Sequence, residues 1–390
     1  MSERRIRVGV NLLWLVPGVV GGSEEYVTRL LRALADLDPP DLEVQLFGLD
    51  ELAVAHPDLA KRFPLRTIAL RGRLKALRVA AETTWLAAQV RRARLDVVWH
   101  PGGVVPPLTG GAAAVLTIHD LRPLDLPEGF SRTKVAYLRT VLPRSVRRAA
   151  VVTAPSQQVV AEIEDRFGVP ADRLRAVPHG IGADLFDPVP PAEVDRVRAV
   201  YDLAGRWLLY PVITYPHKDH VTLVRAFARL APTHPDVDLV LTGGEGPAEP
   251  EVARAIAASG VADRIRRTGR VPRADLDALL DGAVAVAFPS RYEGFGNGAL
   301  EALAKGTPVV AADATSLPEV VGDGGLLVPP GDIGAWADAL ARVLDDDALA
   351  ARLGAAGRVH AARFTDRAGA EELLFTLRSA ADSGPGPAAG

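Results

Sequence analysis

The sequence predicts an α/β protein with two Rossmann-like domains, each a parallel sheet between layers of helices. Short apolar runs typical of buried strands alternate with amphipathic helical stretches, which is the pattern of a parallel sheet. The alternation occurs in two series, separated by a stiff segment that contains Pro188, Pro190 and Pro191. A chain of 390 residues is also longer than a single domain with one hydrophobic core usually is, so two domains are expected.

The first series begins with an alternating strand at Ile6, Val8 and Val10. A helix follows, with Ser23 as the expected N-cap and apolar residues at helical spacing from 27 to 34. Further buried strands of this series are expected at residues 44–47, 97–99, 114–118 and 151–154.

The second series begins with a strand at 207–212 and continues to 309–312. Between them, strands are expected in DVDLVLT before Gly243, in IRRTG up to Gly269, and at 283–288. We therefore place the first domain at residues 1–188 and the second at 189–360. The last residues, SGPGPAAG at 383–390, are expected to be a disordered tail.

Composition excludes several classes of protein. Cysteine is absent, so the chain offers no disulfide, no thiolate metal site and no cysteine nucleophile. No segment approaches the roughly 18 apolar residues of a membrane span. The N-terminal MSERRIRVGVN enters a strand without the apolar core of a signal peptide. We expect a cytoplasmic protein.

The net charge of −3 is unevenly distributed, because residues 61–148 carry 17 Lys and Arg against 5 Asp and Glu. Such a run is most often a solvated helix face. The alternatives are peripheral contact with the inner face of an anionic membrane, or an acidic acceptor such as a pyrophosphate-linked lipid. A nucleic-acid partner is not expected, because interleaved aromatics and recognition motifs are missing. The basic residues form two stretches, Arg71, Arg73, Lys75, Arg78, Arg91, Arg92 and Arg94, and then Arg132, Lys134, Arg139, Arg144, Arg147 and Arg148.

The segment FPSRYEGFGNGALE at 288–301 concentrates the features of a binding site. An apolar strand ends at Phe288, glycines follow, and a helix begins and runs to Gly306. Glycines at such a junction let backbone N–H groups approach a ligand, and the positive helix end favours a phosphate. Glu293 and Glu301 can bracket that phosphate and accept hydrogen bonds from sugar hydroxyls.

These residues, with EALAKGTPVVA after them, resemble the signature of the retaining GT-B glycosyltransferases of family 4, and similar motifs extend from Gly21 to about Asp332. IHDLRPLDLP and PHKDH resemble in particular bacterial polysaccharide mannosyltransferases. The resemblance implies a GT-B fold whose two domains face each other across a cleft. It further implies an acceptor-binding first domain, a nucleotide-sugar-binding second domain, and a last helix at 361–382 that packs back on the first.

Lys218, in a loop between a strand and a helix, is placed to meet the donor diphosphate. A lysine is unfavourable at the positive end of a helix, so an anionic partner is expected there. The resembled family places an arginine a few residues earlier, where this chain has Pro211, Val212 or Ile213. Neutralisation of the phosphate is therefore expected from Lys218, His217 and backbone amides.

His119 follows a predicted strand in TIHDL, and the resemblance implies that it lines the sugar cleft and orients or polarises donor and acceptor. His100, at another strand end, is a weaker candidate, because a lone histidine is usually a packing residue. Gly21 and Gly22 precede a helix, where a tight turn and a phosphate cradle are both reasonable from the residues, and the resemblance favours the cradle.

The resemblance also assigns residues after two further strands to the nucleotide, with Arg270 and Val271 near the base. The predicted catalytic residues are His119, Lys218 and Glu293. The predicted donor-binding residues are Gly21, Gly22, His217, Lys218, Gly243, Arg270, Val271, Glu293, Gly294, Phe295, Gly296, Asn297 and Glu301.

No metal or other cofactor is expected. Three Asp-x-Asp sequences, at 36–38, 236–238 and 275–277, lie at a helix end, before a strand and in a helix. None follows a strand's carboxyl end, so we interpret them as surface or capping residues. Lys218 and helix N-termini can balance the charge of a diphosphate leaving group instead.

The predicted function is metal-independent transfer of a hexose, with retained configuration, from a nucleotide-diphosphate sugar to a hydroxyl group of a glycan, a lipid-linked or a small-molecule acceptor. The resemblance favours GDP-mannose over UDP-hexoses as the donor. Two alternatives share the same cleft. One is a nucleotide-sugar epimerase or phosphorylase of the same fold, and the other is an inactive nucleotide-sugar-binding subunit.

Overall fold

The structure is a computed structural model that describes residues 5–70, 72 and 74–384. Arg71, Arg73 and the tail at 385–390 lie outside these residues. The chain forms two compact units, unit 1 with residues 1–180 and 366–390, and unit 2 with Ile181–Thr365. The predicted boundaries at 188 and 360 thus lie inside unit 2. The reason is that Ile181 and Leu185 are buried in the core of unit 2, ahead of the prolines that suggested the boundary.

Unit 1 contains a seven-stranded sheet in which every pairing is parallel, with the order β3-β2-β1-β4-β5-β6-β7. The strands β3 and β7 are short edge strands that the sequence did not predict. The bounds of the strands are β1 Ile6–Leu12, β2 Leu42–Leu49, β3 Leu65–Ile68, β4 Val97–His100, β5 Ala113–Thr117, β6 Val151–Ala154 and β7 Leu174–Ala176.

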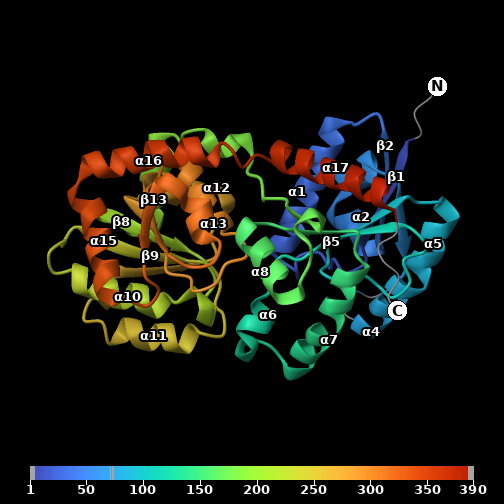
Figure 1. Cartoon of the computed structure of the whole chain (residues 1–390). Coiled ribbons are helices and arrows are strands. Elements are labelled where there is room, and N and C mark those ends of the chain that lie inside the picture. The colour runs from blue at the N-terminus through green and yellow to red at the C-terminus, as the bar shows by residue number, and fades with distance from the viewer. Residues whose placement is uncertain (1–4, 71, 73, 385–390) are drawn as a thin grey trace. The chain divides into compact units, whose positions relative to one another are not determined.

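Alternate residues of β4, β5 and β6 in unit 1 enter different cores, because side chains of a strand point to opposite faces. On β4, Val97 and Trp99 pack with α1 and α17, while Val98 packs with α5 on the other face. Figure 1 shows α17, in red, beside α1, so the last helix completes the first unit. The helices are α1 Gly22–Leu37, α2 Asp50–Ala55, α3 Pro57–Arg62, α4 Lys75–Thr83, α5 Trp85–Ala93, α6 Arg122–Asp125, α7 Arg132–Arg148, α8 Gln157–Phe167 and α17 Asp366–Ser383.

Unit 2 contains a six-stranded sheet, again parallel throughout, with the order β10-β9-β8-β11-β12-β13. Its strands are β8 Arg206–Pro211, β9 Val237–Thr242, β10 Ile265–Gly269, β11 Ala285–Phe288, β12 Val309–Ala312 and β13 Gly325–Val328. Its helices are α9 Pro191–Val200, α10 His220–Leu230, α11 Glu249–Ala257, α12 Arg273–Gly282, α13 Asn297–Lys305, α14 Leu317–Val321, α15 Ile333–Asp345 and α16 Asp347–Ala361. The predicted class, two parallel-sheet domains, is confirmed.

The strand orders locate the binding edge of each unit. In unit 1 the chain runs outward from β1 to β2 on one side and resumes at β4 on the other. In unit 2 the same reversal occurs between β8 and β11. Loops that follow two such neighbouring strands diverge to opposite faces of the sheet and leave a crevice at their carboxyl ends, where open α/β sheets bind ligands.

One local prediction is wrong. Helix α1 begins at Gly22, and its N-cap is Gly21 rather than Ser23, with no side-chain cap. Gly21 has φ 64°, a left-handed conformation that a serine at the cap would adopt less readily. The glycine therefore determines where the helix begins.

Candidate functional site

The reversal point of unit 2 brings Lys218 and Glu293 into contact. Lys218 is the last residue of the 3₁₀ turn Pro216–Lys218, which follows β8, and Glu293 lies in the loop after β11. The Lys218 Nζ lies 2.6 Å from Glu293 Oε1. The two side chains keep 17% and 12% of their exposure, so water screens this pair only in part.

Hydrogen bonds from neighbouring strands hold both loops in place. Tyr210 donates through its hydroxyl to the Lys218 carbonyl at 2.7 Å and lies 3.0 Å from the Ser290 hydroxyl. Glu293 donates its N–H to Thr315 Oγ1 at 2.9 Å, and Ser316 donates to the Glu293 carbonyl at 2.9 Å. The backbone of Lys218 is therefore held by a side chain of β8, and the backbone of Glu293 is held by side chains of the loop after β12.

The second glutamate of the motif, Glu301, lies on α13 and meets a different cation. Arg273, the first residue of α12, places its Nη1 2.9 Å from Glu301 Oε2. Arg273 is not among the residues predicted from the sequence. Its only sequence signal is that it follows Gly269 by four residues, and arginines at the start of a surface helix are too common to indicate a site.

The glycine-rich loop enters α13 as predicted. Gly296 is the N-cap with φ 110°, and Asn297 is the first helical residue. Phe295, predicted to bind the donor, is buried to 4% exposure and packs edge-on against Phe364, with ring centroids 5.7 Å apart. Its side chain therefore belongs to the core, and its backbone is the part that lies in the loop with Gly294.

Gly243 follows β9 and touches the loop that carries Lys218. A Cβ on Gly243 would lie 2.5 Å from the Val212 carbonyl oxygen, so only glycine allows this approach. Beside it, a Cβ on Gly244 would lie 3.0 Å from Arg270 Nε. Arg270 forms no hydrogen bond or ion pair with any described residue, whereas Val271 packs on the core of unit 2.

Arg291 is a further basic residue that sequence reasoning missed. Its N–H donates to the His217 carbonyl at 2.8 Å, and its Nε lies 2.8 Å from Asp219 Oδ2. The His217 ring stacks on Tyr215 with centroids 5.6 Å apart. The loops and helix starts that follow the strands of unit 2 therefore carry four cations, Lys218, Arg270, Arg273 and Arg291. Lys218 and Arg273 pair with the two glutamates of the motif.

His119 lies at the carboxyl end of β5 in unit 1. Its Nε2 donates to the Pro101 carbonyl at 2.8 Å, which leaves Nδ1 of the neutral ring as an acceptor. Burial lowers the pKa of His119, so the ring is neutral at physiological pH. The Tyr26 ring packs edge-on against the His119 ring, with centroids 5.2 Å apart, and the centroid of the His179 ring lies 4.5 Å from that of Tyr26.

Gly21 and Gly22 lie at the start of α1 with open space around them, since an added Cβ on either would meet no heavy atom within 4 Å. The nearby Glu24 carboxylate accepts from the Gly18 N–H at 2.8 Å and contacts His56 Nε2 at 2.8 Å. This open geometry fits both interpretations of these glycines, a tight turn and a phosphate-binding loop.

Three of the six aspartates in the Asp-x-Asp sequences form the following ion pairs. Asp36, in the last turn of α1, pairs with Arg62. Asp275 pairs with Arg196 at 2.6 Å and accepts from the Tyr201 hydroxyl. Asp277 pairs with Arg273 at 2.7 Å.

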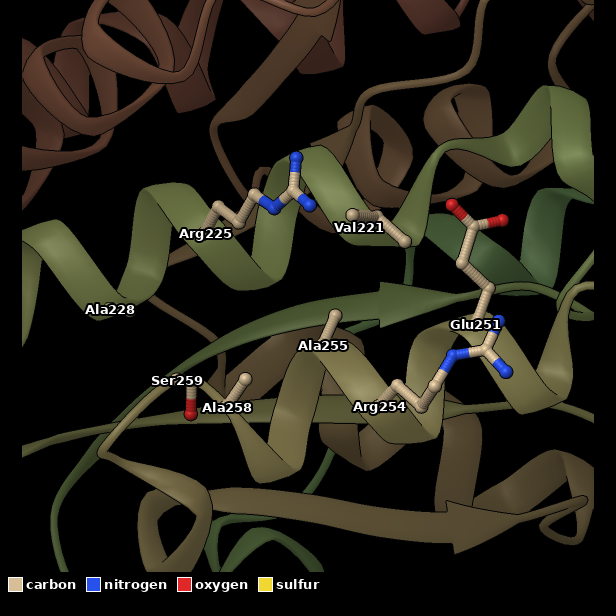
Figure 2. A pocket seen from close by; sticks show the side chains of 8 residues that line it. All are labelled: Val221, Arg225, Ala228, Glu251, Arg254, Ala255, Ala258 and Ser259. Atoms are coloured by element: carbon tan, nitrogen blue, oxygen red, sulfur yellow. The ribbon is translucent and has the colours of Figure 1, made fainter.

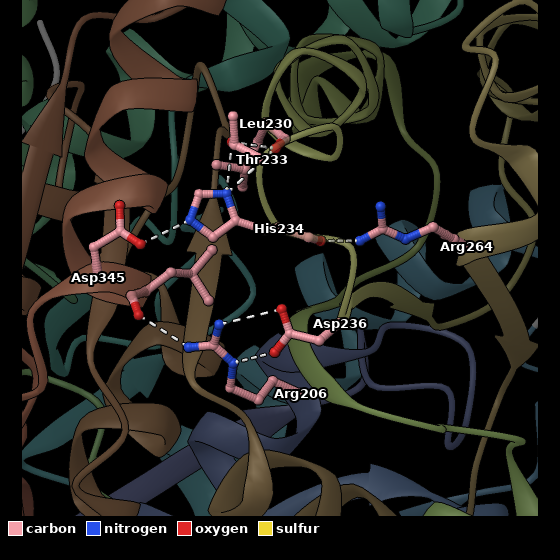
Figure 3. A network of polar contacts seen from close by, with 8 residues as sticks. Arg206, Leu230, Thr233, His234, Asp236, Arg264 and Asp345 are labelled. Atoms are coloured by element: carbon pink, nitrogen blue, oxygen red, sulfur yellow. Dashed lines mark hydrogen bonds and ion pairs between the residues drawn. The ribbon is translucent and has the colours of Figure 1, made fainter.

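Asp236, of the remaining Asp-x-Asp sequence, belongs to a network of polar contacts just before β9 (Figure 3). Asp236 pairs with Arg206 at 2.8 Å, and His234 lies 2.9 Å from Asp345. Asp238 lies within β9 rather than before it, which corrects the prediction for that residue. Among the described residues, no three His, Asp or Glu side chains form a group that could hold a metal ion.

A separate groove on unit 2 runs between α10 and α11 (Figure 2). Arg225 and Arg254 extend over it, and small side chains form its floor. Val221 and Glu251 of this groove lie in the first turns of α10 and α11. Its residues are Val221, Arg225, Ala228, Glu251, Arg254, Ala255, Ala258 and Ser259.

The two family matches fall one in each half of the chain. The family described as Glycosyltransferase Family 4 matches residues 20–185, and the family described as Glycosyl transferases group 1 matches residues 208–360.

Among the helices of the described residues, none combines the length and the apolar character that a membrane span requires.

Curated relatives include the O-antigen chain mannosyltransferase B of Escherichia coli, which is 34% identical over 65% of this chain and 66% of its own. A D-inositol 3-phosphate glycosyltransferase of Corynebacterium glutamicum is 35% identical over 58% of this chain and 57% of its own. A GDP-mannose-dependent alpha-(1-6)-phosphatidylinositol monomannoside mannosyltransferase of Mycolicibacterium smegmatis is 35% identical over 59% and 62%. The chain thus spans about three fifths of the length of these relatives.

Solved structures match across nearly the whole chain. The Anabaena protein Alr3699/HepE, solved with UDP and glucose, has a TM-score of 0.74 at 21% identity and covers 96% of this chain and 100% of its own. Sucrose-phosphate synthase of Thermosynechococcus elongatus has a TM-score of 0.76 at 24% identity, with 96% and 98% covered. The first half of the chain thus carries a Glycosyltransferase Family 4 domain and the second half a Glycosyl transferases group 1 domain, and the fold is that of the GT-B proteins.

Proposed function

We propose that this chain transfers a hexose from a nucleoside-diphosphate sugar to a hydroxyl group of an acceptor. The observation that carries the proposal is the contact of Lys218 with Glu293 at the reversal point of the unit 2 sheet, in the loop that leads into α13. A cation, a carboxylate and the N–H groups of a helix start are what a diphosphate-linked sugar requires.

The chemistry follows from the leaving group. A nucleoside diphosphate departs readily, so the protein has to position the sugar and stabilise the charge that develops on the phosphate. Lys218, His217 and the amides of residues 294–297 supply the positive charge and hydrogen-bond donors. Glu293 and Glu301 accept hydrogen bonds from sugar and ribose hydroxyls.

Retained configuration is part of this proposal. It rests on the family resemblance, which favours attack on the face from which the phosphate departs, with that phosphate accepting the acceptor proton. His119 serves to orient or polarise the reacting groups, because its neutral ring presents Nδ1 as an acceptor. Because the cations balance the leaving group, we expect transfer to continue at an unchanged rate in excess EDTA.

The names of the relatives favour GDP-mannose as the donor. Two of the three curated relatives described above are named mannosyltransferases, and one of these two is named as GDP-mannose-dependent. UDP-hexoses are the alternative, since a protein of the same fold was solved with UDP and glucose. The acceptor is a glycan, a lipid-linked or a small molecule such as an inositol phosphate, in line with the same names.

Peripheral membrane binding belongs to the proposal as well. Helix α4 exposes Leu77 and Val79 beside Lys75, and α7 exposes Arg132, Arg139 and Arg144. Exposed apolar and basic side chains together bind an anionic bilayer surface, at about 1 kcal/mol per basic residue. Sedimentation with anionic but not neutral liposomes at low salt is expected, and failure to sediment with either contradicts this part.

The central test is a thermal-shift screen of GDP-, UDP- and ADP-sugars followed by transfer assays with the stabilising donor. Lys218→Ala, Glu293→Ala and Glu301→Ala should each lower transfer about 100-fold or more, the range seen when one charge-stabilising group is removed. Glu164→Ala, an exposed glutamate in the last turn of α8, is the matched control and should keep the wild-type rate. Wild-type rates in all three site variants would refute the site.

The same assays separate the alternatives. An altered sugar nucleotide formed without any acceptor would identify an epimerase, and sugar 1-phosphate formed with inorganic phosphate a phosphorylase. Tight donor binding with no turnover against any acceptor would identify a binding subunit.

A further inference from the structure

Glu249, the first residue of α11, connects three neighbouring strands of unit 2 near their carboxyl ends. Its carboxylate accepts two hydrogen bonds from Arg267 of β10, one from Nη1 at 2.7 Å and one from Nη2 at 2.8 Å. Its Oε2 also accepts from the hydroxyl of Thr214 at 3.0 Å, and Thr214 lies in the loop after β8. Helix α11 itself follows β9. One carboxylate therefore links β10 to the segments that follow β8 and β9.

The pair of Glu249 and Arg267 is suited to hold this junction. A bidentate contact fixes the direction of both side chains as well as their distance. The side chains of Glu249 and Arg267 keep 20% and 27% of their exposure, so water screens their charges only in part. The hydrogen bonds from Arg267 lower the pKa of the Glu249 carboxyl, which is therefore ionised at neutral pH.

Thr214 carries this contact to the loop that contains Lys218. Thr214 is 2% exposed, its hydroxyl accepts from the Gly246 N–H at 2.7 Å, and its carbonyl accepts from the Ala248 N–H at 2.9 Å. A Cβ on Gly246 would lie 2.6 Å from that carbonyl oxygen, so the loops after β8 and β9 are in direct contact. The 3₁₀ turn that ends at Lys218 begins two residues after Thr214.

Without the Glu249 carboxylate, the Thr214 hydroxyl loses its acceptor and Arg267 remains as a partly buried cation without its partner. We propose that Glu249 is a positioning residue, which fixes the start of the turn and thereby places Lys218 against the donor diphosphate. A charge-stabilising group works only at its correct place, so a small displacement of the turn lowers the rate of transfer. The role toward the diphosphate rests on the proposed function, whereas the fixing of the turn does not.

Transfer assays on Glu249→Gln, Lys218→Ala and the double variant test this route. Glutamine keeps the size of the side chain but loses the charge and one of the two acceptor oxygens. We expect Glu249→Gln to lower kcat about tenfold and to change the KM for the donor less, because Lys218 meets charge that develops as the phosphate departs. When Lys218 is already alanine, the same change should lower kcat by less than about twofold. An equal factor in both backgrounds, or a wild-type rate in Glu249→Gln, overturns the proposal.

Asp236→Asn is the matched control. It removes a bidentate contact with Arg206 at the opposite, amino end of the same sheet (Figure 3). This variant should lose stability in urea as Glu249→Gln does, but its kcat and KM should be those of the wild type. A fall of kcat in both variants, in proportion to their loss of stability, would show a general effect of ion-pair loss and would overturn the positioning role.

Hydrogen exchange of the full chain without ligand, followed by mass spectrometry, measures the turn independently of any activity. Peptides that cover residues 213–220 should exchange about tenfold faster in Glu249→Gln than in the wild type, and at the wild-type rate in Asp236→Asn. Unchanged exchange in Glu249→Gln overturns the positioning role even where the wild type transfers sugar. Faster exchange in Glu249→Gln, together with a wild type that neither binds nucleoside diphosphates nor transfers sugar, supports the fixing of the turn and refutes the proposed function.

Discussion

Lys218 and Glu293 balance each other's charge, and so do Arg273 and Glu301. A diphosphate that reaches Lys218 therefore shares this cation with a carboxylate that is only 12% exposed. Removing one member of such a pair leaves the other charge partly buried and uncompensated. Loss of activity in Lys218→Ala is for this reason to be compared with its loss of stability.

Arg270 differs from these cations because no described residue neutralises it, and it lies against Gly244 at the strand ends. If its side chain meets the diphosphate while its backbone meets the base, Arg270→Gln should raise the Kd for a nucleoside diphosphate about tenfold. The Kd for the nucleoside should stay unchanged. Isothermal titration with both ligands measures this.

The control for Arg270 is Arg266→Gln on β10, the strand that precedes Arg270, where the Arg266 side chain pairs with Asp202. It should bind both ligands as the wild type does. An equal loss of nucleoside and nucleoside diphosphate affinity in Arg270→Gln would place the side chain at the base and contradict the phosphate contact.

His220, the first residue of α10, gives unit 2 a defined response to acid. It is 2% exposed, and burial lowers its pKa to about 4, whereas the unfolded chain has the usual value near 6.5. The unfolded state then binds more protons, so stability is complete above pH 6.5 and is lost as pH falls toward 4. Between pH 7 and pH 5 this amounts to about 2 kcal/mol.

Replacing the titrating group should remove that dependence. The difference in unfolding free energy between wild type and His220→Gln is expected to shrink by about 2 kcal/mol from pH 7 to pH 5, measured by urea unfolding of unit 2. A difference that stays constant with pH would show that His220 does not titrate in this range.

At the scale of elements, the loops after β8 and β9 depend on each other. Gly243 has φ 126°, and its Cα approaches the Val212 backbone so closely that a Cβ would lie 2.5 Å from a carbonyl oxygen. Gly243→Ala should therefore destabilise unit 2 by about 2 kcal/mol or more and displace the loop that carries Lys218. Nucleotide affinity should fall with it.

Gly260 separates the two causes of this effect. It also has positive φ, 74°, but an added Cβ would meet no heavy atom within 4 Å. Gly260→Ala should cost only the backbone strain, about 1 kcal/mol, and should leave nucleotide binding unchanged. Equal effects of the two alanines in calorimetry and titration would refute the coupling of the loops.

Helix α17 shows how the whole chain is organised. The chain completes unit 2 and then returns to unit 1, where Leu373 and Leu377 are buried in its core. Arg29 of α1 holds Asp366 at the start of α17 through two hydrogen bonds of 3.0 Å. Unit 1 therefore consists of two segments far apart in the sequence, and it cannot complete its core until the last helix has been made.

Leu377→Ala should destabilise unit 1 by about 2–5 kcal/mol, the usual range for a buried leucine. Phe375→Ala, on the exposed side of the same helix at 54% exposure, should change stability by less than 1 kcal/mol. Chemical unfolding of both variants measures this. Comparable losses in the two variants would contradict the position of α17.

Much of this organisation follows from local pattern. The central strands were predicted within a few residues, because their apolar runs are buried on both faces, and the loop into α13 was predicted from its glycines. The edge strands β3, β7 and β13 were missed, because β3 and β7 each carry an arginine among three or four residues and β13 is a short run between glycines and prolines. The proline segment placed the predicted domain boundary too late in the chain, because Ile181 and Leu185, which precede it, already belong to the core of unit 2.

Contacts between distant residues follow from the strand order instead. Lys218 and Glu293 are 75 residues apart and Arg29 and Asp366 are 337 apart, and no local pattern pairs them. The same holds for Arg273, Arg291 and Glu249, which are unremarkable singly. Periodicity, capping and glycine positions act between neighbours along the chain and are readable there, whereas charge pairing and the burial of polar groups act through space and depend on which strand ends the topology brings together.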